Sequence, residues 1–469
     1  MDLHKLTIKQ TLDGLKQKEF SSEELTKSCF ERIKNLEGKL NAFVTTTEAG
    51  AIKNAKEADQ KIADGINLPL LGVPFAIKDN FCTAGVKTTA SSQLLDDFIP
   101  PYDATVVTKL KEAGIVMLGK TNMDAWAHGS STETSDYGST KNPWNLNHLP
   151  GGSSGGSAAS IASDEAIGSI GSETAGSIRQ PASWCGVVGL KPTYGRVSRY
   201  GVIAMASSLD CPGPIVKTVE DSALVLNILA GVDEYDATTS PKSVEDYIKN
   251  LNQKIDGLTI GISDDYFIGV EEEVKEKVMD AIKQLEKLGA KIKKIDLFDP
   301  KYAIAVYTIL QRAEVSSNLA RYDGIRYGGE RDKFGEEAKR RIMLGTYVLS
   351  AGYYDAYYLK AQKVRTIIVE DFIKAFKDVD VIVGPTSPSV ALPVGSSKNH
   401  PMFGEMADIL VEPSTIAGLP GISIPCGFTK AGLPVGMQII GPQFAESLIL
   451  NVAHQYEQAT EWHKEKPKL

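Results

Sequence analysis

The stretch GGSSGGSAASIASDEAIGSIGSETAGS, residues 151–177, decides how this 469-residue sequence can fold. Of its 27 residues, eight are serine, seven glycine and five alanine, a composition that also suits a flexible linker. Three isoleucines interrupt it, however, and the next segment, RQPASWCGVVGLKPTYG, mixes Trp, Cys and Val as a packed region does. We therefore expect a packed segment whose small residues let the backbone approach a ligand and whose exposed N–H groups can bind negative charge.

The sequence on both sides alternates between helical and strand-like patterns. Residues 1–65 look helical, and Ser21 and Glu24 have the spacing of a capping box. From Leu70 onward, short apolar runs alternate with amphipathic stretches of helical period. We expect strands within 72–78, 115–118, 258–262, 290–297, 378–385, 421–428 and 433–440, and helices within 103–114, 219–231, 271–289 and 445–459. This alternation predicts an α/β fold.

Composition and charge exclude several classes of protein. Hydrophobic residues make up 42% and charged residues 23% of the chain, as in an ordinary globular protein with a sizeable core. The 59 acidic and 51 basic residues give a net charge of −8, which opposes a surface that grips nucleic acid. Apolar runs stay below the ~18 residues that span a bilayer. The first ten residues lack a secretory signal, so we expect a cytoplasmic protein.

Cysteines and histidines indicate neither disulfides nor a metal centre. The five cysteines are scattered without a CxxC pair, so we expect reduced, mostly buried thiols. The six histidines show no HExxH or clustered spacing, and we predict that the chain holds no metal.

Two short motifs match known site patterns but lack the required context. GIVMLGKT, residues 114–121, fits the phosphate-binding pattern G-x-x-x-x-G-K-[ST], yet a helical stretch precedes it and apolar residues fill its loop. We interpret residues 115–118 as a buried strand. GGSSGG, residues 151–156, contains G-x-S-x-G, but a Pro- and Asn-rich loop replaces the preceding strand. The downstream histidines are also poorly placed for a Ser-His-Asp triad.

A lysine offers another way to activate a serine. Lys78 ends the apolar run 73–77 and precedes Asp79 and Asn80, so its side chain would leave a buried strand and enter a site. A lysine acts as a base for a serine hydroxyl when its amine is neutral near pH 7. Lowering its pKa from ~10.4 to ~7 disfavours the ammonium by about 4.6 kcal/mol, which burial in a dry pocket can supply. Without its sequence context, Lys78 could equally be a surface lysine whose aliphatic chain is buried and whose amine reaches water.

The segments GVPFAIKDN, GGSSGGSAAS and SETAGSIRQPASWCGVVGLKPTYGRVSRYGV together resemble the amidase signature family. The resemblance implies that Lys78 is the base, Ser153 the bridging serine, commonly held by a cis peptide, and Ser177 the nucleophile. It also implies an α/β fold in which a large twisted mixed β-sheet is surrounded by helices. We expect one domain over residues 1–469, with the signature core at 70–220.

Within this family, residues 318–328, 339–365 and 384–389 resemble the glutamine-hydrolysing subunits of tRNA-dependent amidotransferases. This implies that ammonia passes to a partner, the B subunit, where ATP and Mg²⁺ serve to activate the glutamate of Glu-tRNA(Gln), and that a small C subunit completes a heterotrimer. No cofactor is expected in this chain, and the partner would make most of the tRNA contacts. Two alternatives are a stand-alone amidase acting on a small or aryl amide and a scaffold protein with a decayed site. The presence of all three triad residues argues against decay.

The resemblance also implies an oxyanion hole. The backbone N–H groups of Thr174, Ala175, Gly176 and Ser177 would stabilise the tetrahedral intermediate, at roughly 3 kcal/mol per donor. The usual DTGGS of the family reads ETAGS at residues 173–177. A Cβ at Ala175 would cost about 1–2 kcal/mol if that residue needed a positive φ.

A glutamine zwitterion needs a cation for its α-carboxylate and an anion for its α-ammonium. By resemblance the pocket contains Arg341 for the carboxylate, Asp408 for the ammonium, Tyr307 beside them, and Gly129 and Ser130. The usual DEFAMGSS reads DAWAHGSS at residues 124–131, and we expect this difference to alter the packing or the shape of the pocket.

Overall fold

The computed structural model describes residues 2–326, 328–398 and 400–469. Within these ranges one mixed sheet of eleven strands forms the centre of the molecule. In spatial order the strands are β1 (Phe43–Thr46), β3 (Val116–Thr121), β2 (Pro74–Lys78), β4 (Gly168–Glu173), β6 (Cys211–Val216), β5 (Val188–Lys191), β10 (Gly421–Phe428), β11 (Pro434–Ile440), β9 (Val381–Pro385), β7 (Thr259–Ile262) and β8 (Lys291–Lys294).

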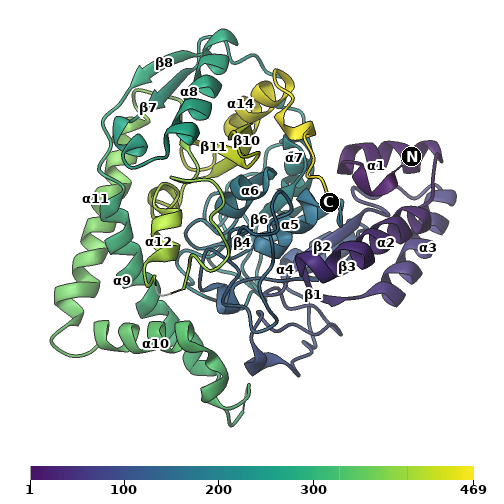
Figure 1. Cartoon of the computed structure of the whole chain (residues 1–469), viewed down its shortest axis with the longest axis horizontal. Helices are drawn as coiled ribbons and strands as arrows, with labels where there is room; N and C mark the ends of the chain where they lie inside the picture. Colours follow the sequence, from purple (N-terminus) through teal and green to yellow (C-terminus); the bar gives the residue numbers. More distant parts are fainter. Residues whose placement is uncertain (1, 327, 399) are drawn as a thin grey trace.

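Helices surround this sheet, which confirms the predicted α/β class (Figure 1). They are α1 (Ile8–Gln17), α2 (Ser22–Leu40), α3 (Glu48–Ala63), α4 (Thr105–Glu112), α5 (Gly155–Ala162), α6 (Arg179–Cys185), α7 (Val219–Leu229), α8 (Glu272–Lys287), α9 (Lys301–Asn318), α10 (Glu336–Val348), α11 (Lys360–Ala375), α12 (Phe403–Asp408), α13 (Glu412–Ile416) and α14 (Glu446–Gln458). In Figure 1, α1–α3 lie at one end of the molecule and α9–α11 at the other.

The N-terminal region is helical as predicted, with one interruption. The capping box forms at the start of α2, because Ser21 Oγ accepts from the Glu24 N–H and the Glu24 carboxylate accepts from the Ser21 N–H, at 3.1 and 2.8 Å. Asn41, with a φ of 54°, ends that helix, and β1 follows where only helix was expected. Pairing with β3 stabilises this short edge strand, and such a tertiary contact is not visible in the local pattern.

Two parallel strands bring distant residues to the same edge of the sheet. β2 pairs with β4 in parallel, with Ile77 beside Ile170, and every residue of both strands is buried. The carboxyl ends of parallel neighbours lie on one side of a sheet. Lys78, which ends β2, therefore lies close to the end of β4 and to the segment that follows it.

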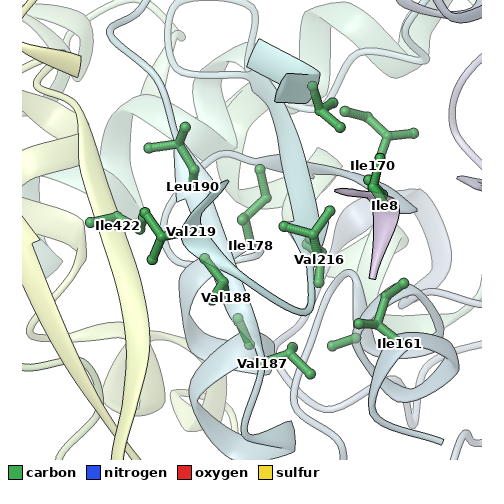
Figure 2. Close-up of a cluster of buried hydrophobic side chains, with 14 of the residues drawn as sticks. Ile8, Ile161, Ile170, Ile178, Val187, Val188, Leu190, Val216, Val219 and Ile422 are labelled. Carbon is green, nitrogen blue, oxygen red and sulfur yellow. The ribbon is translucent and has the colours of Figure 1, made fainter. Parts of the chain in front are cut away.

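The small-residue segment 151–177 is buried throughout, which excludes a linker. It forms α5 and β4, and Figure 2 shows its Ile161 and Ile170 within the core cluster. Gly156 illustrates why the residues are small. A Cβ added there would lie 2.4 Å from the Ala42 carbonyl oxygen and 2.5 Å from that of Asn122, so only glycine allows this approach.

Other predictions from the sequence are also confirmed. Residues 116–121 form the buried strand β3, after α4 and a glycine at position 114 with a φ of 94°, so GIVMLGKT is strand rather than a phosphate loop. All five cysteines are unpaired and buried. Of the helices in the described residues, none has both the length and the apolar character needed to cross a membrane.

Candidate active site

Lys78 is fully buried and contacts two serines. Its Nζ lies 2.8 Å from Ser153 Oγ, 3.0 Å from Ser172 Oγ and 3.1 Å from the Ser172 carbonyl oxygen. Asn80 donates a further hydrogen bond to Ser172 Oγ at 2.9 Å. The Lys78 nitrogen has three hydrogen-bonding positions, and all three are used: two are directed at Ser172 and one at Ser153. The alternative of a surface lysine is therefore excluded.

Burial changes the acid–base behaviour of this lysine. It lowers the pKa of Lys78 to about 7, although the nearby carboxylates of Asp124, Asp210 and Glu173 favour the charged form. A large fraction of the amine is therefore neutral at physiological pH, and its lone pair can accept a proton. The side chain is chemically suited to act as a base.

Ser153 and Ser177 lie on adjoining segments beside this lysine. Ser153 precedes α5 and follows a cis peptide bond to Gly152. The Ser154 N–H donates to the Ser177 carbonyl oxygen at 3.2 Å, which joins the two segments. Both serines are buried. The structure thus places Ser153 in contact with Lys78 and joins its segment to that of Ser177.

The segment between β4 and α6 presents unused backbone donors. No described residue accepts a hydrogen bond from the N–H groups of the four predicted donors, Thr174, Ala175, Gly176 and Ser177. The segment is held by its other groups, because Thr174 Oγ1 donates to Asp210 and the Ala175 carbonyl accepts from Thr415 Oγ1, both at 2.7 Å. Ala175 does not adopt a positive φ, so its Cβ causes none of the strain considered from the sequence. Fixed, unused N–H groups of this kind can stabilise an oxyanion.

A buried ion pair between Glu173 and Arg179 joins the two ends of this segment, and it was not predicted from the sequence. The Glu173 carboxylate accepts from the backbone N–H groups of Ile178 and Arg179, at 3.1 and 3.0 Å. The Arg179 guanidinium donates to Glu173 Oε1 from Nε and Nη2, at 2.9 and 2.6 Å. The E-x₅-R spacing in ETAGSIR was the available signal, but without the loop geometry the two residues could not be paired.

A cavity of about 360 Å³ is lined by residues within 125–136, 334–341 and 397–405. Of the predicted site residues, Gly129, Ser130 and Arg341 line this cavity. Its lining does not include Lys78, Ser153, Ser177, Tyr307 or Asp408. The connection runs through Asp408, at the end of α12. Ser130 Oγ donates to Asp408 Oδ2 at 2.7 Å, and a Cβ added at Gly176 would lie 2.5 Å from Asp408 Oδ1. Asp408 therefore lies between the cavity wall and the segment with unused N–H groups.

Opposite charges with spare hydrogen-bonding capacity lie in this region. Arg341 on α10 donates from Nε to Glu337 at 2.6 Å, but its buried Nη1 finds no partner among the described residues. Asp408 Oδ1 likewise has no partner there. Burial raises the pKa of Asp408 well above its ordinary value, and a cation bound at Oδ1 would restore its ionised form. Burial also raises the pKa of Tyr307, on α9, whose hydroxyl lies within the electrostatic reach of Arg341 and Asp408. A ligand carrying both charges would satisfy these groups.

The segment that departs from the usual family pattern forms part of the cavity wall. Trp126 and Ala127 have φ values of 61° and 62°. The Trp126 ring packs on Tyr322 and Phe334, with centroids 5.0 and 5.4 Å apart. Trp126 and Phe334 both line the cavity, so the aromatic contact closes one of its sides.

Known proteins with the same sequence features share this fold. The Amidase family model matches residues 24–450. The chain is 53% identical to the A subunit of glutamyl-tRNA(Gln) amidotransferase from Carboxydothermus hydrogenoformans over 100% of both chains. It is 54% identical to the same subunit of Thermoanaerobacter pseudethanolicus, over 99% of this chain and 98% of the relative. The crystal structure of that subunit from Thermotoga maritima matches with a TM-score of 0.82 at 41% identity, covering 97% of this chain and 94% of the other. With its Lys, Ser and Ser on the three expected segments, the chain belongs to the amidase signature family.

Proposed function

We propose that this chain hydrolyses glutamine and supplies the ammonia as the A subunit of a tRNA-dependent amidotransferase. The observation that carries the proposal is the buried Lys78 amine, 2.8 Å from Ser153 Oγ, in a chain similar over its whole length to relatives of that name. The name of those relatives supplies the amidotransferase setting, the resemblance in sequence supplies glutamine as the substrate, and the geometry supplies the chemistry.

In the proposed reaction, neutral Lys78 donates two N–H groups to Ser172 and accepts the Ser153 hydroxyl proton on its lone pair. Ser153 in turn accepts the proton of Ser177, whose Oγ attacks the side-chain carbonyl carbon of glutamine. The N–H groups of Thr174, Ala175, Gly176 and Ser177 stabilise the resulting oxyanion. The proton returns through Ser153 to the leaving nitrogen, ammonia departs, and water releases glutamate from the Ser177 ester.

The substrate end of the site suits an amino acid. Arg341 would bind the α-carboxylate through its unpartnered Nη1, and Asp408 would bind the α-ammonium through its unpartnered Oδ1. Tyr307, Gly129 and Ser130 would complete the pocket. Because Asp408 touches the loop at Gly176, a substrate bound to it would have its side-chain amide near Ser177.

The rest of the reaction belongs to partners. The B subunit would use ATP and Mg²⁺ to activate the glutamate on tRNA(Gln), and the C subunit would hold the heterotrimer together in the cytoplasm. The net charge of −8 supports tRNA contact mainly through the partner. This chain itself would need no cofactor, since its base, nucleophile and oxyanion donors are all side chains and backbone groups.

A stand-alone amidase is the second candidate, because the same triad hydrolyses other amides within the family. The full-length relatives at 53% and 54% identity favour the amidotransferase role, as does the pair of opposite charges at Arg341 and Asp408. A small neutral amide would leave both charges unpaired.

The test is to purify the chain alone and with the B and C subunits co-expressed from the same genome. Glutamine hydrolysis is followed as glutamate and ammonia, with and without Glu-tRNA(Gln) and ATP. We expect co-purification of the three chains and equal amounts of the two products. A chain that remains alone and cleaves an aryl amide but not glutamine would contradict the proposal.

A further inference from the structure

We propose that His128 is a further substrate-binding residue, whose imidazole donates a hydrogen bond to the α-carboxylate of the glutamine held by Arg341. This inference rests on the proposed function and concerns the same pocket. His128 belongs to the segment that departs from the usual family pattern, in which DEFAMGSS has methionine at this position.

The first observation is the place of this histidine. It directly precedes Gly129 and Ser130 and lines the same 360 Å³ cavity as Arg341. Its side chain is fully buried, yet neither Nδ1 nor Nε2 has a hydrogen-bond partner among the residues that the structure describes. Buried polar groups of native proteins are nearly always paired, and an unpaired one costs stability. A ligand in the cavity would provide the missing partner.

The second observation is the charge around the ring. Burial lowers the pKa of His128 well below its ordinary value, and the Arg341 and Arg312 guanidiniums act in the same direction. The imidazole is therefore neutral at physiological pH and has one N–H donor and one acceptor nitrogen. It adds a directional donor to this wall without adding a third positive charge.

The neighbouring carboxylates each accept from an arginine, and Glu405 Oε2 has no partner among the described residues. Glu337 accepts from Arg341 at 2.6 Å, and Glu405 accepts from Arg312 Nη2 at 2.8 Å. The unpartnered Nη1 of Arg341 and the unpartnered N–H of His128 are left on the same cavity. Two donors, one cationic and one neutral, match the two oxygens of a carboxylate.

The test compares His128→Met with His128→Asn in the form of the protein that hydrolyses glutamine. Methionine has a similar volume and is the usual residue of the family pattern, so the fold should tolerate it. Asparagine keeps a neutral N–H donor. Steady-state rates are measured with glutamine and with glutamine α-amide, in which a carboxamide replaces the α-carboxylate. Glutamine affinity is measured separately by calorimetry in a Ser177→Ala background, where no turnover occurs.

We expect His128→Met to raise the KM and the Kd for glutamine roughly tenfold, the effect of one hydrogen bond to a charged group, with kcat within about twofold. His128→Asn should recover most of that loss, and the α-amide should be hydrolysed equally by all three proteins. An unchanged KM in His128→Met, equal losses on both substrates, or no recovery in His128→Asn would each overturn the inference.

These results separate the two proposals. If the wild-type complex hydrolyses no glutamine, the proposed function fails and this inference fails with it. If the wild type hydrolyses glutamine and His128→Met has the same KM, only the role of His128 is overturned. Thermal unfolding of both variants shows whether a loss comes from the binding site or from the fold.

Discussion

At the scale of single residues, Lys78 shows why the chain can use serines without a histidine. Its amine is surrounded by protein at the end of β2, where an ammonium has lost its water and receives only partial compensation from Asp124, Asp210 and Glu173. The burial that destabilises the Lys78 ammonium also leaves much of the amine neutral, and the neutral amine is the base. The contacts to Ser172 then hold the amine in one orientation toward Ser153.

The first prediction is that Lys78→Arg is as damaging as Lys78→Ala. A guanidinium retains its proton at any physiological pH and cannot accept one from Ser153. Both variants should lose at least about a hundredfold in kcat for glutamine, the usual contribution of a positioned base. Steady-state hydrolysis by both proteins is the measurement. If the arginine variant kept its activity, Lys78 would act through its charge and not as a base.

The second prediction concerns pH. Because the working form of Lys78 is the unprotonated amine and its pKa is about 7, activity should rise with pH. The neutral fraction goes from about a tenth at pH 6 to about nine tenths at pH 8, so kcat/KM should increase roughly tenfold over that range. The residual activity of Lys78→Ala, measured over the same pH range, should lack this step. A wild-type profile that is flat or falls between pH 6 and 8 would count against the base.

The sequence motifs identify the catalytic side chains, but they do not identify the groups that contact those side chains. Lys78, Ser153 and Ser177 could be selected from the sequence because the family pattern assigns each one a position. The sequence could not predict that Lys78 and Asn80 both contact the Ser172 hydroxyl, because these contacts follow from the register of β2 against β4. His128 stood out only as a departure from a pattern, and its unpartnered nitrogens are a property of the folded pocket.

At the scale of elements, the turn between β4 and α6 sets the oxyanion geometry. The third prediction is that Gly176→Ala impairs activity, because the new Cβ would lie 2.5 Å from both Asp408 Oδ1 and Val411 Cγ2. Relieving that overlap moves either the loop or the end of α12, at a cost of about 1–3 kcal/mol. Glutamine hydrolysis and urea unfolding measure the two effects.

Ala175→Gly is the matched control for this loop. Ala175 does not need a positive φ, so glycine there should cost only about 0.5–1 kcal/mol in flexibility and leave kcat/KM within about threefold. Equal activity losses in the two variants would mean that the loop tolerates no change at all and that the Asp408 contact is not the cause.

Helices α10 and α12 carry the charges that would select the substrate. The fourth prediction is that Arg341→Ala and Asp408→Asn raise the KM for glutamine at least about thirtyfold, because each leaves a buried ligand charge unpaired, a penalty of about 2–5 kcal/mol. A small neutral amide should lose little further rate. Lys339→Ala removes a positive charge from the same helix at a more exposed position and should leave the KM unchanged. Equal losses on both substrates would indicate collapse of the site, and no loss on glutamine would mean that the pocket is assigned wrongly.

At the scale of the whole molecule, the sheet brings the site together from distant parts of the chain. Arg179 illustrates this, since it donates to Glu173 on β4, to the Val411 carbonyl next to α13 and to Gln438 on β11. The periodicity of the sequence predicts seven of the eleven strands in the described residues, whereas β1, β4, β5, β6 and the helices α9–α11 are not predicted by it. The order of the strands depends on contacts such as these, so the arrangement could be expected only from the family resemblance.

The fifth prediction tests the central claim at this scale, in the assembled complex. In Ser177→Ala the nucleophile is missing but the fold and the partner's site are intact, so glutamine hydrolysis should fall at least about a hundredfold. Conversion of Glu-tRNA(Gln) to Gln-tRNA(Gln) with ATP and ammonium chloride should continue at the wild-type rate. Ser160→Ala, whose hydroxyl donates to the Ser157 carbonyl within α5, is the control for removing a buried hydroxyl and should keep both activities.

The most direct single measurement is therefore the rate of glutamate release from glutamine by the Ser177→Ala complex, with ammonia-dependent transamidation recorded on the same preparation. We predict that the first is lost and the second is kept. Glutamate release above about a tenth of the wild-type rate, equivalent to less than about 1.4 kcal/mol of barrier, would contradict Ser177 as the nucleophile and with it the proposed mechanism.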